Sequence, residues 1–115
     1  MQKTSSKKFN IVVTSNFTKE VKGLIKKYPS IKSDLLTLIS LLESNPKKGV
    51  SLGKDCFKIR MAISSKGKGK RGGSRVITCV KIVASTVFLL SIFDKSTKDG
   101  FSDKELKELL RIAGL

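Results

Sequence analysis

The chain has 115 residues, a length that fits one domain, and hydrophobic residues make up 39% of it. No apolar run approaches the roughly 18–20 residues of a membrane-spanning helix, so we expect none. Residues 1–8 are basic and polar and lead into no long apolar core of the secretory type, which predicts a cytoplasmic location. We predict a basic, flexible N-terminal tail over residues 1–8 and a single domain over residues 9–115.

The charge of the chain is large and unevenly placed. Lysine and arginine number 24 against 9 acidic residues, which gives a formal net charge of +15. Self-repulsion of this size opposes compaction, so we expect it to serve an anionic partner such as nucleic acid, a membrane surface or an acidic protein; the alternative is mere solubility. No acidic residue lies between Asp55 and Asp94. That concentrated field favours a surface for the nucleic-acid backbone.

Missing residue types exclude several chemistries. The chain has no histidine, and its two cysteines, Cys56 and Cys79, are isolated, so we expect no metal and no other cofactor. Ser-His and Cys-His nucleophiles are excluded for the same reason. A symmetric hairpin around residues 64–74 would place Cys56 near Ile82 rather than Cys79, so we expect ordinary strand packing in a reducing compartment.

The first predicted elements are a strand and a helix. Residues 9–14 are rich in β-branched side chains, which predicts a strand. Apolar residues then recur at helical spacing over residues 17–28, with Asn16 as the expected N-cap and Pro29 as the stop.

A second helix is predicted over residues 31–44, with Ser30 as its cap. Leu36 and Leu41 widen its apolar stripe beyond one face. This width is typical of a deeply buried helix, and the alternative is a helix that also contacts a partner.

Three strands are predicted in the second half of the chain. Residues 54–63 alternate strictly between apolar and other side chains, which predicts a strand with Lys58 and Arg60 side by side on the face opposite the core. A glycine-rich basic loop over residues 64–74 leads into a strand over residues 75–83. After a short turn that favours an antiparallel hairpin, a strand apolar on both faces, over residues 87–93, is expected to be central.

A third helix is predicted over residues 103–112. Ser102 and Glu105 form the pattern of a capping box, and Phe101 and Leu106 that of a hydrophobic staple. The predicted order is therefore β-α-α-β-β-β-α. We expect an α+β fold in which two N-terminal helices pack on a small, mostly antiparallel twisted sheet.

The glycine-rich loop contains Gly-x-Gly-x-x-Gly at Gly67, Gly69 and Gly72. A dinucleotide site needs this motif to open a helix, whereas here it leads into a strand, so we reject that interpretation. The loop can instead clamp a phosphodiester without reading sequence, and the alternative is a solvated hairpin tip. Its cations are Lys66, Lys68, Lys70 and Arg71.

Several segments occur in a recognisable order. These are Lys-Lys-Tyr-Pro at residues 26–29, Asn45-Pro46, Cys-Phe-Lys-Ile-Arg at residues 56–60, Arg-Val-Ile at residues 75–77, and a hydrophobic strand ending in Asp94-Lys95. Their order and spacing over residues 9–115 resemble the RelE/ParE superfamily of toxins from type II toxin–antitoxin systems, and most of all its RelE/HigB branch.

The resemblance implies an endoribonuclease, or mRNA interferase, that inhibits translation by cutting mRNA in the ribosomal A site. It also implies a cognate antitoxin protein as partner, and a site of lysine and arginine that needs no metal. RNA can be cut by attack of its own 2′-OH on the adjacent phosphate, and fixed cations stabilise the charge that develops.

Carried onto this sequence, the resemblance gives a role to each of four residues. Lys58 positions or activates the 2′-OH, and Arg60, where lysine is frequent, neutralises the phosphate. Arg75 stabilises the transition state, and Lys95 stands where an arginine protonates the leaving group. The residues that we expect to bind RNA are Lys66, Lys68, Lys70, Arg71, Lys81, Phe93 and Phe101.

One position departs from the family pattern. Phe101 falls near the place of the catalytic tyrosine, and phenylalanine can stack on a base but cannot share a proton. Phe93 and Phe101 are alternatively plain core or staple residues. Two other functions stay open: a ParE-like toxin that inhibits gyrase, and a non-catalytic basic module that binds nucleic acid. The nuclease interpretation requires Lys58, Arg60 and Arg75 to converge on one phosphate.

Overall fold

The computed structural model describes residues 8–98 and 100–115, so the predicted N-terminal tail lies outside the described residues except for Lys8. The elements follow in the order β1 (Asn10–Val13), α1 (Ser15–Lys27), α2 (Ile31–Ser44), β2 (Val50–Gly53), β3 (Cys56–Met61), a single 3₁₀ turn (Ser64–Lys66), β4 (Ser74–Lys81), β5 (Thr86–Asp94) and α3 (Asp103–Ile112). The strands form one sheet in the order β1-β5-β4-β3-β2. Among the described strands, only β1 and β5 pair in parallel, which confirms the predicted α+β fold with a mostly antiparallel sheet.

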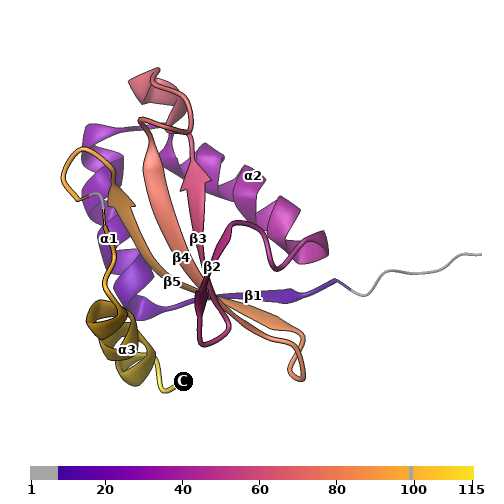
Figure 1. The fold of residues 1–115 in the computed structure, drawn as a ribbon. Coiled ribbons are helices and arrows are strands. Elements are labelled where there is room, and N and C mark those ends of the chain that lie inside the picture. The colour runs from indigo at the N-terminus through magenta and orange to yellow at the C-terminus, as the bar shows by residue number, and fades with distance from the viewer. Residues whose placement is uncertain (1–7, 99) are drawn as a thin grey trace, which may run out of the picture.

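Each face of the sheet carries its own apolar core. The helices α1 and α2 cover one face, and α3 packs against the other (Figure 1). β4 is the middle strand and is buried from Ser74 to Val80. The strand predicted to be central, β5, is interior but lies one place to the side, between β1 and β4.

The N-terminus of α1 differs from the prediction. Thr14 is its N-cap in place of Asn16, because the Thr14 hydroxyl accepts a hydrogen bond from the Phe17 N–H at 3.3 Å. Asn16 instead donates to the Leu90 carbonyl at 3.0 Å, beyond the point where β1 stops pairing with β5. The same stretch of β5 is completed by Glu20, which accepts from the Ile92 N–H. Side chains of α1 thus satisfy the sheet edge that β1 leaves open.

The second helix has the predicted bounds but not the predicted burial. Ser30 flanks α2 without an N-cap hydrogen bond. Leu36 and Leu41 are 60% and 48% exposed, so the deeply buried helix was the wrong interpretation. The helix is amphipathic, and the extra leucines lie outside its buried stripe.

The strand predicted over residues 54–63 extends only over Cys56–Met61 in the structure, and the prediction missed the strand β2 that precedes it. Lys54 and Asp55 have positive φ and form the turn between β2 and β3. The sequence of β2, Val-Ser-Leu-Gly, is too short and too polar to show an alternation. The next strand, predicted over residues 75–83, runs from Ser74 to Lys81.

The register of the β3–β4 hairpin was also predicted wrongly. Met61 pairs with Ser74, which places Cys56 opposite Cys79 instead of near Ile82. The connection is asymmetric because Gly73 approaches the end of β3 closely: a Cβ at Gly73 would lie 2.4 Å from the Met61 oxygen. Both cysteines are free and buried.

Within residues 8–98 and 100–115, the helices are all too short or too polar to cross a bilayer.

Two glycine-to-alanine changes should act in opposite directions. Gly23→Ala adds a methyl group that meets nothing within 4 Å on an exposed turn of α1, and should raise the free energy of unfolding by about 0.5–1 kcal/mol. Gly73→Ala forces backbone against backbone and should lower it by about 1–3 kcal/mol. Urea unfolding followed by circular dichroism measures both. A Gly73→Ala variant as stable as the parent chain would show that the hairpin does not depend on this close approach.

Candidate functional site

A row of side chains crosses three strands on one face of the sheet. Arg60 of β3 is the register partner of Arg75 of β4, which is the partner of Phe93 of β5. Directly paired residues share a face, and Lys58 lies two residues before Arg60, so it shares the face as well. The structure therefore brings four predicted site residues together on the face that α3 partly covers. We call Lys58, Arg60, Arg75 and Phe93 the basic row.

The two arginines of the basic row differ in accessibility. Arg60 is exposed and Lys58 is partly exposed, whereas Arg75 is only 3% exposed. The Arg75 guanidinium donates to the carbonyl oxygens of Lys70, Arg71 and Ser74, each at 3.1 Å. Arg75 therefore fastens the glycine-rich loop to the sheet, and Lys58 and Arg60 are the cations that a large substrate can reach.

A buried carboxylate anchors the same loop from the other side. Asp94, at the end of β5, accepts hydrogen bonds from the Tyr28 hydroxyl at 2.7 Å and from the Lys66 ammonium at 2.8 Å. Burial alone would raise the pKa of Asp94, but the hydrogen bonds from Lys66, Tyr28 and Ser96 outweigh it and hold the pKa well below its usual range. Lys66 is thus a partner of Asp94, with a side chain that is 13% exposed.

A second carboxylate holds the 3₁₀ turn. Asp34 of α2 accepts hydrogen bonds from the Ser64 N–H at 2.9 Å, from the Ser64 hydroxyl, and from the Ser30 hydroxyl at 2.8 Å. Burial opposes the charge, but these bonds lower the pKa of Asp34. The base of the loop is fixed at both ends, while its tip, residues 67–71, is exposed.

The tip of the loop and the end of β5 enclose a small cationic hollow of about 240 Å³. Lys95 directly follows β5, and its backbone N–H donates a hydrogen bond to the Gly73 carbonyl at 3.0 Å. This bond holds the end of β5 against the loop, so Lys95 lines the hollow. The residues that line the hollow are Lys66, Lys68, Gly72, Lys95 and Ser96. Lys70 and Arg71 are exposed on the same loop.

Lys81 does not join this cluster. It lies at the opposite end of β4, six residues or about 20 Å from Arg75 at the rise of a strand. Its ammonium lies 3.7 Å from the Asp55 carboxylate.

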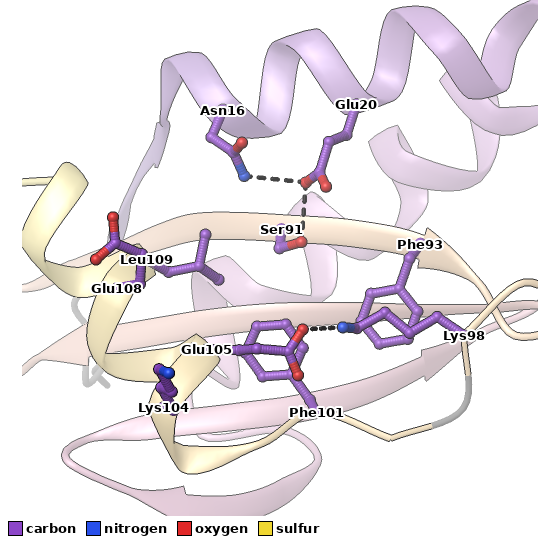
Figure 2. A pocket seen from close by; sticks show the side chains of 10 residues that line it. All are labelled: Asn16, Glu20, Ser91, Phe93, Lys98, Phe101, Lys104, Glu105, Glu108 and Leu109. Carbon is purple, nitrogen blue, oxygen red and sulfur yellow. Dashed lines mark hydrogen bonds and ion pairs between the residues drawn. The ribbon is translucent and has the colours of Figure 1, made fainter.

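The two predicted aromatic residues lie together in a groove beside the basic row. The rings of Phe93 and Phe101 stack with centroids 5.9 Å apart and an angle of 7° between their planes, and the Lys98 ammonium lies over both (Figure 2). Phe101 also packs in the same apolar cluster as Leu106, as the predicted staple requires, and the Ser102–Glu105 capping box is present.

The groove has a volume of about 420 Å³ and lies between α1, β5 and α3. Of the residues that the structure describes, three carboxylates and two lysines line it, so it suits a phosphate less well than the basic row does. These charged residues are Glu20, Glu105, Glu108, Lys98 and Lys104.

Sequence reasoning missed the residues that hold the loop: Tyr28, Asp34 and Asp94. Tyr28 and Asp34 lie within helical patterns and give no sign of a contact with the loop. Asp94 gave a weak sign, since it is an acidic residue directly after a buried strand.

Solved structures of toxins from toxin–antitoxin systems share this fold. A double arginine-to-alanine mutant of the E. coli toxin RelE in the free state has a TM-score of 0.61 and 15% identity, covering 91% of this chain and 97% of that chain. The isolated E. coli RelE toxin has a TM-score of 0.55 and 19% identity, covering 90% and 98%. The RelBE2 toxin–antitoxin complex from Mycobacterium tuberculosis has a TM-score of 0.54 and 13% identity, covering 78% and 94%.

The sequence itself matches the family described as the RelE toxin of the RelE / RelB toxin–antitoxin system, over residues 11–115. The chain therefore belongs to the RelE toxin family. No curated protein sequence matches it significantly.

Removing the Asp94 charge should weaken the fold and change its response to acid. Asp94→Asn should lower the free energy of unfolding at pH 7 by about 2–3 kcal/mol, because Lys66 loses its buried partner. The pKa of Asp94 is lower in the folded chain than in the unfolded chain, so its contribution is complete above about pH 5 and is lost as the pH falls below about 4. The variant should therefore lose less stability than the parent chain between pH 5 and pH 2.

Asp103→Asn is the matched control. Its carboxylate is 63% exposed and pairs with Lys107 at 3.5 Å on the surface of α3, so its removal should cost less than about 1 kcal/mol. Denaturant titrations from pH 7 to pH 2 measure both variants. Equal effects of the two substitutions would contradict the anchoring role of Asp94.

Proposed function

We propose that this chain is the toxin of a type II toxin–antitoxin system and acts as an mRNA endoribonuclease, at the ribosomal A site and without a metal. The observation that carries the proposal is the basic row, because Lys58 and Arg60 share one face with Arg75 in a chain of the RelE family. We further propose that it acts in the cytoplasm and that a cognate antitoxin protein restrains it.

The proposed reaction forms a bond between the 2′-oxygen and phosphorus and breaks the bond from phosphorus to the 5′-oxygen. Lys58 orients the 2′-OH and, in its free amine form, takes up the hydroxyl proton to become an ammonium, and Arg60 contacts the phosphate oxygens. Lys95 donates a proton to the departing 5′-oxygen. Arg75 acts through position: it keeps the loop and its own positive charge beside the phosphate.

The remaining predicted contacts fall into two groups. Lys68, Lys70 and Arg71 are exposed on the loop and can follow the RNA backbone without reading its sequence. Phe93 and Phe101 offer a stacked aromatic surface next to the row. Lys81, at the far end of β4, would contact RNA only as a peripheral cation.

A non-catalytic RNA-binding protein of the same fold is the second candidate. Two observations favour it. The side chain of Phe101 has no proton to donate, and the Arg75 guanidinium already donates hydrogen bonds to carbonyl oxygens of the loop. The two candidates differ in whether mRNA is cut.

Expression in bacteria of the parent chain and of a Lys58→Ala/Arg60→Ala variant tests the proposal. The parent chain should arrest growth and create new mRNA 5′ ends within codons, and the double variant should cut at least about 10²-fold more slowly. Lys22→Ala is the matched control, since it removes an exposed cation from α1, the helix that covers the opposite face of the sheet, and should keep full activity.

Arrest without cuts that survives in the double variant would point to a gyrase-type target. The absence of arrest and of cuts would favour the non-catalytic candidate. The Arg75 guanidinium also holds the loop, so the free energy of unfolding of an Arg75→Ala variant should be measured alongside its activity.

Cleavage should not depend on a divalent metal at the toxin site. Purified chain added to ribosomes stalled on a defined mRNA should cut with the same rate constant after dialysis of the toxin alone against EDTA. Restoration of a lost activity by added Mn²⁺ or Zn²⁺, at constant Mg²⁺ for the ribosome, would contradict this.

A further inference from the structure

Two buried thiols face each other across the β3–β4 hairpin. Cys56 is the first residue of β3 and is the register partner of Cys79, near the end of β4. Both cysteines are free, and each is 0% exposed. They are the two cysteines of the chain, and neither has a part in the basic row or in the glycine-rich loop.

The backbone hydrogen bonds beside the two cysteines define the geometry of the pair. The Val80 N–H donates to the Asp55 carbonyl at 2.8 Å, as the residues that flank a non-hydrogen-bonded pair do. The Cα atoms of such a pair lie about 4.5 Å apart, and the two side chains share a face. A disulfide needs Cα atoms about 4.4–6.8 Å apart, so one can form here without a shift of register.

Hydrogen bonding between the two thiols favours ionisation of one of them. Cys56 has a single thiol proton, which it donates to the Lys54 carbonyl at 3.3 Å. When this proton turns toward a Cys79 thiolate it stabilises the negative charge. That hydrogen bond, helped by the charge of Lys81, outweighs burial and the nearby Asp55 and lowers the pKa of Cys79 to about 7. Because the thiolate is the nucleophile, Cys79 is the thiol that attacks an oxidant first.

The cover over the pair is only partly closed. Both cysteines lie in the apolar cluster between the sheet and α3. Leu52 of β2 and Leu109 and Leu110 of α3 pack against this cluster and are themselves only partly buried. Hydrogen peroxide is a small neutral molecule, so brief local openings of this cover admit it, whereas a protein oxidant needs a larger opening.

We propose that Cys56 and Cys79 are an oxidation site, at which a peroxide converts the two thiols into a disulfide that cross-links β3 to β4 and stabilises the folded chain. In a reducing compartment the pair stays as thiols, so the cross-link marks a rise in oxidant. The paired residues are already in register, so the bond leaves Lys58 and Arg60, further along β3, in place. The inference does not depend on whether the chain cuts RNA.

The reaction proceeds in two steps that balance. The Cys79 thiolate attacks one oxygen of hydrogen peroxide, the O–O bond breaks, and the departing hydroxide takes up a proton as water, which leaves a sulfenic acid on Cys79. The Cys56 sulfur then attacks the Cys79 sulfur, the S–O bond breaks, and the hydroxyl group leaves with the Cys56 proton as a second water. The two thiols lose two electrons, and the peroxide gains them.

Peptide mapping of the oxidised chain tests the chemistry. The purified full chain is treated with hydrogen peroxide at low protein concentration, alkylated and digested with trypsin without reduction. Cleavage after Lys54, Lys58, Arg75 and Lys81 should release peptide 55–58 joined to peptide 76–81, with a mass two hydrogen atoms below the sum of the two. The intact chain should stay a monomer on a non-reducing gel, and dithiothreitol should restore both thiols.

Thermal unfolding tests the consequence. A disulfide between residues 56 and 79 encloses the whole glycine-rich loop and restricts the unfolded chain. The midpoint of the oxidised parent chain should therefore exceed that of the reduced parent chain by at least about 5 °C. Cys56→Ala and Cys79→Ala each keep one thiol, so peroxide should give neither variant this increase. The comparison of oxidised with reduced parent chain holds even if a variant folds poorly.

Three results would overturn the proposal. The first is that both thiols of the folded chain survive a peroxide treatment that oxidises them in urea. The second is that oxidation links separate chains, or stops at sulfenic or sulfinic acid without the cross-linked peptide. The third is an oxidised parent chain whose unfolding midpoint equals that of the reduced chain.

Discussion

The carboxylate of Asp94 joins three segments that are far apart in the sequence: the end of α1 through Tyr28, the base of the glycine-rich loop through Lys66, and the end of β5. A buried carboxylate is costly unless its partners surround it, so each partner must be in place for the others to be stable. The loop in turn positions Arg75 and Lys95, through bonds to its backbone carbonyls. One acidic residue thus fixes where several cations of this basic chain lie.

The face of the sheet that carries the basic row also carries the apolar cluster beneath α3. Alternate residues of a strand point to the same face, which is why buried and basic side chains occur together there. Cys56 and Cys79 are buried in the cluster that α3 covers, and Arg60 and Arg75 lie on the same face four residues away, at the other end of the β3–β4 pair. The short helix α3 covers only one end of this face. The other end keeps its cations open, so the length of α3 sets the boundary between core and site.

Much of the fold followed from local patterns, because periodicity and capping are properties of neighbouring residues. The bounds of α2 and α3 and the capping box at Ser102 are examples. The hairpin register did not follow, since it depends on how closely Gly73 approaches Met61 in space. The placement of Lys58 and Arg60 on one face was predictable from alternation, whereas the burial of Arg75 and the pairing of Lys66 with Asp94 required the tertiary structure.

Arg60 and Arg75 are paired neighbours of the same residue type, and the order of the strands separates their roles. β4 is central, so Arg75 is enclosed and its guanidinium serves the loop. β3 loses its outer partner after Lys58, so Arg60 is exposed and its backbone faces an open edge. Of these two paired arginines, Arg60 is therefore the one whose side chain a phosphate can reach.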